Sequence, residues 1–174
     1  IFQPAEEGTR GARSMVEAGV VDDVDYFIAS HIGTGVPHNH FVASNNGFLA
    51  TSKLDVRFKG LASHAGGSPE EGKNAMLAAA NAVINLSAIP RHSGGVSRVN
   101  VGEIHAGSGR NVIADEAVLK VETRGETSEV NDYMKNYAES VISGAAQMHQ
   151  VEYEIELVGE GINAEGSPEV AEVL

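Results

Sequence analysis

Residues 52–158 constrain the fold most, because their apolar pattern switches between the period of a strand and the period of a helix. The clearest strand is at residues 53–58, where polar and apolar side chains alternate as they do when one face is buried. The predicted strands cover residues 53–58, 98–104, 117–123 and 151–157, and the predicted helices cover residues 74–89 and 128–148. Their order along the chain predicts an inserted α+β domain of the ferredoxin-like β-α-β-β-α-β type over residues 51–160.

The first fifty residues have a different pattern, which predicts part of an α/β domain with parallel strands and helices. Residues 1–3 are expected to end a strand, and a short helix is expected around residues 11–18, with Gly19 at its end. Residues 26–31 form a compact apolar run, as a strand buried on both faces does. Strand, helix and strand in this order favour parallel pairing, so residues 1–50 are assigned to a separate domain.

The two ends of the chain indicate a piece of a longer protein. The sequence opens inside a predicted buried strand and without an initiator methionine, so we expect a fragment. Near the other end, Ser167, Pro168 and Glu169 are typical of the start of a helix. Residues 161–174 are therefore expected to return to the first domain.

Charge and composition exclude several classes of function. The net charge is −12 and no basic run occurs, which argues against nucleic acid and anionic lipid as partners. No apolar stretch approaches the ~20 residues of a membrane helix, so we expect no membrane partner and a cytoplasmic protein. The sequence contains no cysteine, so any metal must be held by carboxylate and imidazole groups.

A glutamate pair, Glu6 and Glu7, follows the first predicted strand, and His31 ends the second. Parallel strands place such residues at one edge of a sheet, where one glutamate can bind a cation while its neighbour acts as a general base. A solvated acidic turn and a structural histidine are the alternative interpretations, and each is the commoner case for such a feature alone. Two ligands do not complete a catalytic metal site, which needs three or more.

Five motifs resemble those of the M20 family of metallopeptidases and amidohydrolases, and together they extend over essentially the whole chain. They are Phe2-Gln3-Pro4-Ala5-Glu6-Glu7-Gly8, His31, Gly60-Leu61-Ala62-Ser63-His64-Ala65, Gly107-Ser108-Gly109-Arg110-Asn111-Val112-Ile113 and Glu122-Thr123-Arg124-Gly125. The resemblance implies an α/β catalytic domain that carries a ferredoxin-like lid and dimerisation domain. It also implies two divalent metal ions, zinc or manganese, and hydrolysis of the amide bond of an N-acyl amino acid, most closely of the aminobenzoyl-glutamate type.

The resemblance further implies a role for each residue of the first domain. Glu6 matches the general base, which takes a proton from the attacking water and later hands it to the leaving nitrogen. Glu7 and His31 match metal ligands. Family members carry further ligands in an upstream His-x-Asp segment and in a downstream histidine, which these residues lack, so we expect the fragment alone to bind metal poorly and to lack hydrolytic activity.

Three residues of the second domain match the lid of the family. By resemblance, His64 crosses a dimer interface and stabilises the oxyanion, and Asn111 and Arg124 hold the carboxylate of the substrate. From the residues themselves, Asn111 and Arg124 are expected to meet at one end of the sheet, and the planar fork of an arginine suits a carboxylate. The alternative for Arg124 is a surface salt bridge with Glu122 or Glu126.

The implied partners are a small-molecule N-acyl amino acid and a second subunit, either in a homodimer or in a heterodimer with a related chain. A carboxypeptidase or aminoacylase of the same family is an alternative activity, and a non-catalytic dimerisation module is an alternative function. The other histidines carry no family role. His38 and His40 lie in a polar loop that could line the site, and His92, His105 and His149 are interpreted as structural or surface residues.

Overall fold

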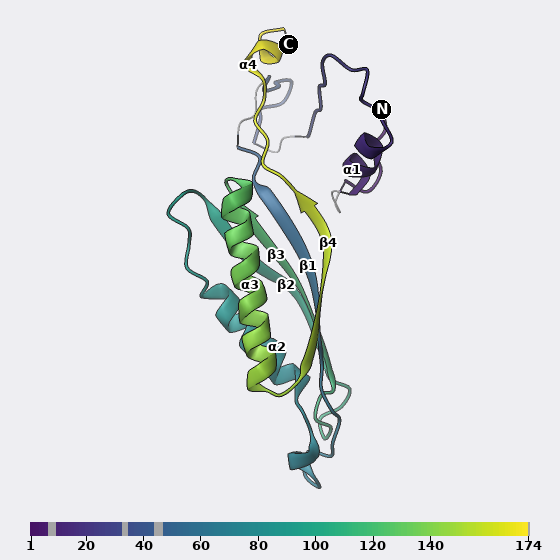
Figure 1. The fold of residues 1–174 in the computed structure, drawn as a ribbon, viewed down its shortest axis with the longest axis vertical. Coiled ribbons are helices and arrows are strands. Elements are labelled where there is room, and N and C mark those ends of the chain that lie inside the picture. Colours follow the sequence, from purple (N-terminus) through teal and green to yellow (C-terminus); the bar gives the residue numbers. More distant parts are fainter. Residues whose placement is uncertain (7–9, 33–34, 44–46, 174) are drawn as a thin grey trace.

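The computed structural model describes residues 1–6, 10–32, 35–43 and 47–173. Four strands and two long helices form the body of an elongated molecule, and the N-terminal segment and the last helix lie beyond one end of the sheet (Figure 1). The elements in chain order are α1 (Arg10–Glu17), β1 (Ala50–Lys59), η2 (Pro69–Glu71), α2 (Ala75–Ser87), β2 (Ser97–Ala106), β3 (Glu116–Gly125), α3 (Ser128–Met148), β4 (Glu152–Gly161) and α4 (Pro168–Ala171).

The four strands form one sheet in the order β2-β3-β1-β4, and every neighbouring pair is antiparallel. Helices α2 and α3 pack against each other and against one face of this sheet, while the opposite face carries charged side chains. The element order from β1 to β4 is that of a ferredoxin-like domain. The predicted α+β architecture of this region is therefore confirmed.

The core lies between the sheet and the two helices. In β1, Leu54, Val56 and Phe58 point toward the helices and are fully buried, and the residues between them belong to the open face. Four buried alanines line the inner side of α2, at positions 75, 78, 79 and 82. Side chains this small let α2 approach both the sheet and α3 closely, so the core is filled by the larger residues of β1, β3 and α3.

Local capping sets where the two long helices begin. The Asn74 side chain accepts a hydrogen bond from the Leu77 backbone N–H (3.1 Å), and α2 starts at the following residue. The Thr127 hydroxyl accepts from the Val130 N–H (3.2 Å) and starts α3, which has the bounds expected from its apolar spacing. Gly125 lets the first turn of α3 approach β3, because a Cβ there would lie 2.2 Å from the Asn131 backbone nitrogen.

In the described part of the first fifty residues, the expected parallel strands are not formed. Residues 1–6 and 26–32 belong to no strand, and their side chains are exposed, with Tyr26 at 74% and Phe27 at 63%. A strand is stable only where neighbouring strands share its hydrogen bonds, and the described residues offer these segments no such partner. The helix of this region is present as α1, and Gly19 follows it with a positive φ of 75°. Among the described helices, none has the length and apolar character needed to cross a bilayer.

Candidate active-site residues

The register of the strands defines two ends of the sheet. At the proximal end, β1 begins and β4 ends, so Ala50 lies opposite Gly125 and Thr51 lies opposite Gly161. At the distal end, β1 finishes and β3 starts, with Lys59 opposite Glu116. The proximal end is the one from which the chain continues into residues 1–49 and 162–174 (Figure 1).

His64 and Asn111 lie together beyond the distal end. The Ala65 N–H donates to the Asn111 carbonyl (2.9 Å), and the Ile113 N–H donates to the Ser63 carbonyl (2.9 Å), so two loops run side by side. Both side chains are exposed. The Gly66 backbone N–H donates to His64 Nδ1 (3.2 Å), which places the proton of a neutral imidazole on Nε2. His64 can therefore present an Nε2–H donor to solvent or to a ligand.

Arg124 lies at the proximal end, near the last residue of β3. Its Nε donates to Glu122 Oε2 (3.0 Å) and its Nη2 donates to Glu122 Oε1 (3.1 Å). The Thr51 hydroxyl also donates to Glu122 Oε1 (3.3 Å). The surface salt bridge considered as an alternative for Arg124 is therefore present in the structure. Because Arg124 is half exposed, such a pair contributes little to stability.

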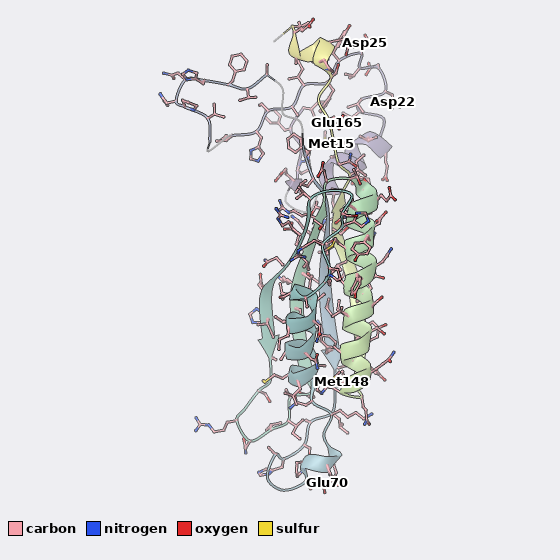
Figure 2. The ribbon with its side chains drawn as sticks, turned by 90° about the vertical axis from the view of Figure 1, so that its left-hand side faces the viewer. Met15, Asp22, Asp25, Glu70, Met148 and Glu165 are labelled. Carbon is pink, nitrogen blue, oxygen red and sulfur yellow. The ribbon has the colours of Figure 1, made fainter. Side chains whose placement is uncertain are left out.

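These positions correct one expectation. Asn111 and Arg124 do not meet at one end of the sheet, because the steps of β3 from Glu116 to Arg124 alone span roughly 27 Å at ~3.4 Å per residue. In Figure 2, Glu70, shortly after His64 in the chain, lies at one extreme of the molecule, and Glu165, shortly after β4, lies near the other. Asn111 does follow a glycine-rich turn and Arg124 does end a strand, but the register assigns them to opposite ends.

Of the residues expected at the metal site, the two that the structure describes, Glu6 and His31, lie on the proximal side. Glu6 is exposed, Glu7 lies outside the described residues, and the exposed His31 has its Nδ1 2.8 Å from the Ile32 carbonyl oxygen. His31 lines an open hollow together with His38, His40 and residues near α4. Carboxylate and imidazole are suitable donors for zinc or manganese. Within the described ranges, however, no group of three or more potential ligands comes together.

The remaining histidines have ordinary surroundings. His92 packs against the Tyr133 ring with the ring centroids 5.0 Å apart. His105 is an exposed residue of β2, 3.4 Å from Glu103, and His149 caps the end of α3. The interpretation of these three as structural or surface residues agrees with their positions.

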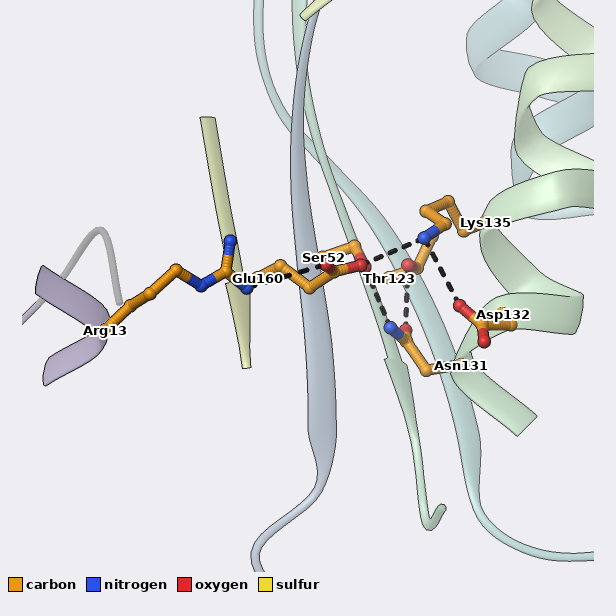
Figure 3. A network of polar contacts seen from close by, with 7 residues as sticks. All are labelled: Arg13, Ser52, Thr123, Asn131, Asp132, Lys135 and Glu160. Carbon is orange, nitrogen blue, oxygen red and sulfur yellow. Dashed lines mark hydrogen bonds and ion pairs between the residues drawn. The ribbon is translucent and has the colours of Figure 1, made fainter. Parts of the chain in front are cut away.

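A polar network at the proximal end was not predicted (Figure 3). The buried Thr123 hydroxyl donates to Asn131 Oδ1 (2.9 Å), and Asn131 Nδ2 donates to the buried Ser52 hydroxyl oxygen (2.8 Å). The Ser52 hydroxyl lies 3.5 Å from Glu160 Oε1, which also accepts from Lys135 Nζ (2.9 Å). The signal was present in the sequence, because Ser52 and Thr123 occupy core-facing positions of two alternating strands.

Charges extend this network toward the N-terminal segment. The hydrogen bond to Glu160 is the main reason that the pKa of Lys135 lies above its ordinary value, and Asp132 adds to the effect from 3.2 Å. On the other side of Glu160, the Arg13 guanidinium of α1 approaches its second carboxylate oxygen to 3.9 Å. One carboxylate thus links the sheet, α3 and α1 at the proximal end.

Comparison with known proteins identifies the family. A family model described as a peptidase dimerisation domain, M20_dimer, matches residues 50–149, which includes β1 and all of α3. The chain belongs to the M20 family. The M20 match covers more than half of the 174 residues, and it falls on the part that folds as the ferredoxin-like domain.

Individual M20 relatives are similar over nearly the whole chain. An indole-3-acetyl-aspartic acid hydrolase of Enterobacter agglomerans is 59% identical and covers 97% of this chain. A p-aminobenzoyl-glutamate hydrolase subunit of Escherichia coli is 57% identical over the same share. An aminobenzoyl-glutamate utilization protein of Klebsiella pneumoniae has a solved structure that matches 98% of this chain at 57% identity and a TM-score of 0.89.

The 174 residues span less than half the length of each of these M20 relatives. They span 38% and 39% of the length of the two curated hydrolases and 44% of the solved Klebsiella protein. A more distant solved structure, a putative aminohydrolase of Staphylococcus aureus, matches at 20% identity and a TM-score of 0.71, which concerns the fold alone.

Proposed function

We propose that the parent protein is a metal-dependent amidohydrolase that cleaves the amide bond of an N-acyl amino acid, most closely of the aminobenzoyl-glutamate type. The observation that carries this proposal is the identity of 57–59% to two hydrolases over 97% of the chain. Their names give different acyl groups, indole-3-acetyl and p-aminobenzoyl, joined to an acidic amino acid. The amino acid is therefore the better defined half of the proposed substrate.

A second activity within the family is supported by weaker similarity. N-acetyldiaminopimelate deacetylases of Streptococcus species are 31–32% identical to this chain, and a carboxypeptidase of Saccharolobus solfataricus is 30% identical. A deacetylase or a carboxypeptidase activity would also be the hydrolysis of an amide bond, with another acyl group in the substrate. The two hydrolases exceed these relatives by at least twenty-five percentage points of identity, which favours the first activity.

The proposed catalytic residues divide between the two domains, which we place at residues 1–50 with 161–174 and at residues 51–160. Glu7 and His31 hold one part of a site for two divalent ions, zinc or manganese, and the remaining ligands belong to other parts of the parent. When bound, such ions would supply a Lewis acid beside the amide carbonyl and the attacking water. Glu6 accepts the proton of that water and delivers it to the leaving nitrogen.

The lid residues then act from two copies of the chain. Arg124 lies at the proximal end, next to the catalytic domain of its own chain, and binds the substrate carboxylate there. Its Nε and Nη2 face Glu122, and its Nη1 offers further N–H donors to the substrate. His64 and Asn111 lie beyond the distal end of the sheet, too far away to reach the substrate bound by Arg124 of the same chain. In a dimer they come from the partner, where the His64 Nε2–H stabilises the oxyanion and the Asn111 side chain assists at the carboxylate.

The surface that suits a second copy lies on α2 and β2. Among the described strands, β2 is an edge of the sheet, and α2 packs over it. The outer side of α2 is apolar, with Ile84 71% exposed and Leu77 52% exposed two turns earlier on the same face. An apolar helix beside an open edge strand is typical of an interface rather than of a solvated surface. We place the dimer contact there, in keeping with the dimerisation domain that the family model describes.

The proposal is tested by Glu6→Ala in the full-length protein, with bound metal and p-aminobenzoyl-glutamate turnover measured on the same samples. Loss of a general base lowers turnover by roughly 10²- to 10⁴-fold while metal content stays normal. Glu17→Ala is the matched control, because Glu17 is an exposed glutamate of α1. Near-normal turnover of the Glu6→Ala protein would contradict the assignment, and a wild-type protein without turnover would favour a non-catalytic dimerisation module.

A further inference from the structure

Two arginines lie side by side on the open face of the sheet at its proximal end. Arg98 of β2 is the direct cross-strand partner of Arg124 of β3. Their neighbours Ser97, Thr123 and Gly125 are buried on the helix side, so both arginines belong to the opposite face, where both are exposed. We propose that Arg98 binds the side-chain carboxylate of an acidic amino acid in the substrate, beside the carboxylate bound by Arg124.

The pairing of two like charges needs a reason, because it runs against the pattern of the rest of β3. Every other pair of β3 with its two neighbours in which both residues are charged joins opposite charges: Lys53 and Glu122, Asp55 and Lys120, Lys59 and Glu116, and Glu103 and Lys120. Like charges directly opposite one another destabilise a sheet. The carboxylate of Glu122 compensates the charge of Arg124, and an anionic ligand that is present during function compensates the charge of Arg98.

The hydrogen-bonding groups of Arg98 are largely available. Its Nη1 donates to the carbonyl oxygen of the preceding Ser97 (2.8 Å). Among the residues that the structure describes, no carboxylate forms a salt bridge with Arg98, whereas Arg124 is held by Glu122. A guanidinium carries five N–H donors, so Arg98 retains enough of them for a two-point contact with a carboxylate.

The geometry fits a substrate with two carboxylates on one short carbon chain. Neighbouring strands lie about 4.8 Å apart, so the roots of the two arginine side chains are separated by about that distance. The two carboxylates of an aspartate or a glutamate are separated by a similar length. The inference rests on the proposed function, in which the amino acid of the substrate is acidic, and it names the residue that distinguishes this amino acid from a neutral one.

The test compares two substrates on the full-length protein, p-aminobenzoyl-glutamate and p-aminobenzoyl-glutamine, whose side chains end in a carboxylate and in a neutral amide of nearly the same shape. Arg98→Gln is expected to lower kcat/KM for the glutamate substrate by roughly 10- to 100-fold, the loss that follows removal of a hydrogen bond to a charged group. For the glutamine substrate kcat/KM stays unchanged. Arg98→Lys retains part of the preference, because an ammonium is a point charge without the two-point fork.

The ratio of the two kcat/KM values is the decisive readout, since a variant that folds poorly loses both activities in equal proportion. Arg57→Gln is the matched control, because Arg57 lies on the same face toward the distal end, paired with Glu116 at 2.7 Å. An unchanged ratio in Arg98→Gln, or a wild-type protein without preference for glutamate, overturns the assignment of Arg98 and leaves the proposed function standing. A wild-type protein that hydrolyses neither substrate overturns the proposed function itself.

Discussion

At the scale of single residues, Asn131 makes the most consequential contact that the sequence did not suggest. It lies at the start of α3, is almost fully buried, and uses both ends of its amide to bond hydroxyl groups on β1 and β3. The alternation of β1 places Ser52 in the core-facing row with Leu54, so a buried polar group was predictable. Its partner was not, because which helix residue lies above Ser52 depends on the tertiary packing of α3.

Asn131→Ala is expected to lower the free energy of unfolding by about 2–3 kcal/mol, because the buried Thr123 hydroxyl then has no acceptor and Ser52 loses a donor. Chemical denaturation of the full-length protein, followed by a probe of the lid domain, measures this change. Asn136→Ala on the exposed side of the same helix is the control and stays within ~0.5 kcal/mol of wild type. Equal effects of the two substitutions would show that the network contributes nothing to stability.

At the scale of elements, the predictions succeeded where a segment carries its own periodicity and failed where it depends on a partner. Helix α3 has the predicted bounds, and the four strands of the sheet fall where alternation or apolar character placed them. Residues 1–3 and 26–31 have the composition of buried strands, yet none is formed there, since strand formation needs a neighbouring strand. Helix α2 forms as its periodicity predicts, yet it is apolar on its outer side as well as on its inner side. The outer side therefore lacks a partner among the described residues.

The outer side of α2 leads to a prediction about assembly. Ile84→Glu in the full-length protein is expected to raise the dimer dissociation constant at least ~10-fold, because a charge is buried where two apolar surfaces meet. Sedimentation velocity over a range of concentrations measures it. Leu157→Glu is the control, since Leu157 is a partly exposed apolar residue of β4 at the other edge of the sheet. A dimer broken by Leu157→Glu and not by Ile84→Glu would place the interface on β4.

At the scale of the whole molecule, the separation of the two ends of the sheet decides how a site can be assembled. Motif spacing indicated which residues belong to the lid, and it could not indicate the end at which each lies, because that depends on strand register over residues 50–125. The register sets His64 and Asn111 at the distal end and Arg124 at the proximal end. We therefore expect each active site of the parent to take residues from two copies of the chain.

The most direct test of this claim is complementation between His64→Ala and Arg124→Ala in the full-length protein, co-expressed with different tags and assayed for p-aminobenzoyl-glutamate hydrolysis. Each variant alone is expected to have little activity. If His64 acts across the dimer, a mixed dimer contains one site with both residues intact, and random pairing restores about a quarter of wild-type turnover. Turnover of the isolated mixed dimer that does not exceed the sum of the two single variants would contradict the shared site.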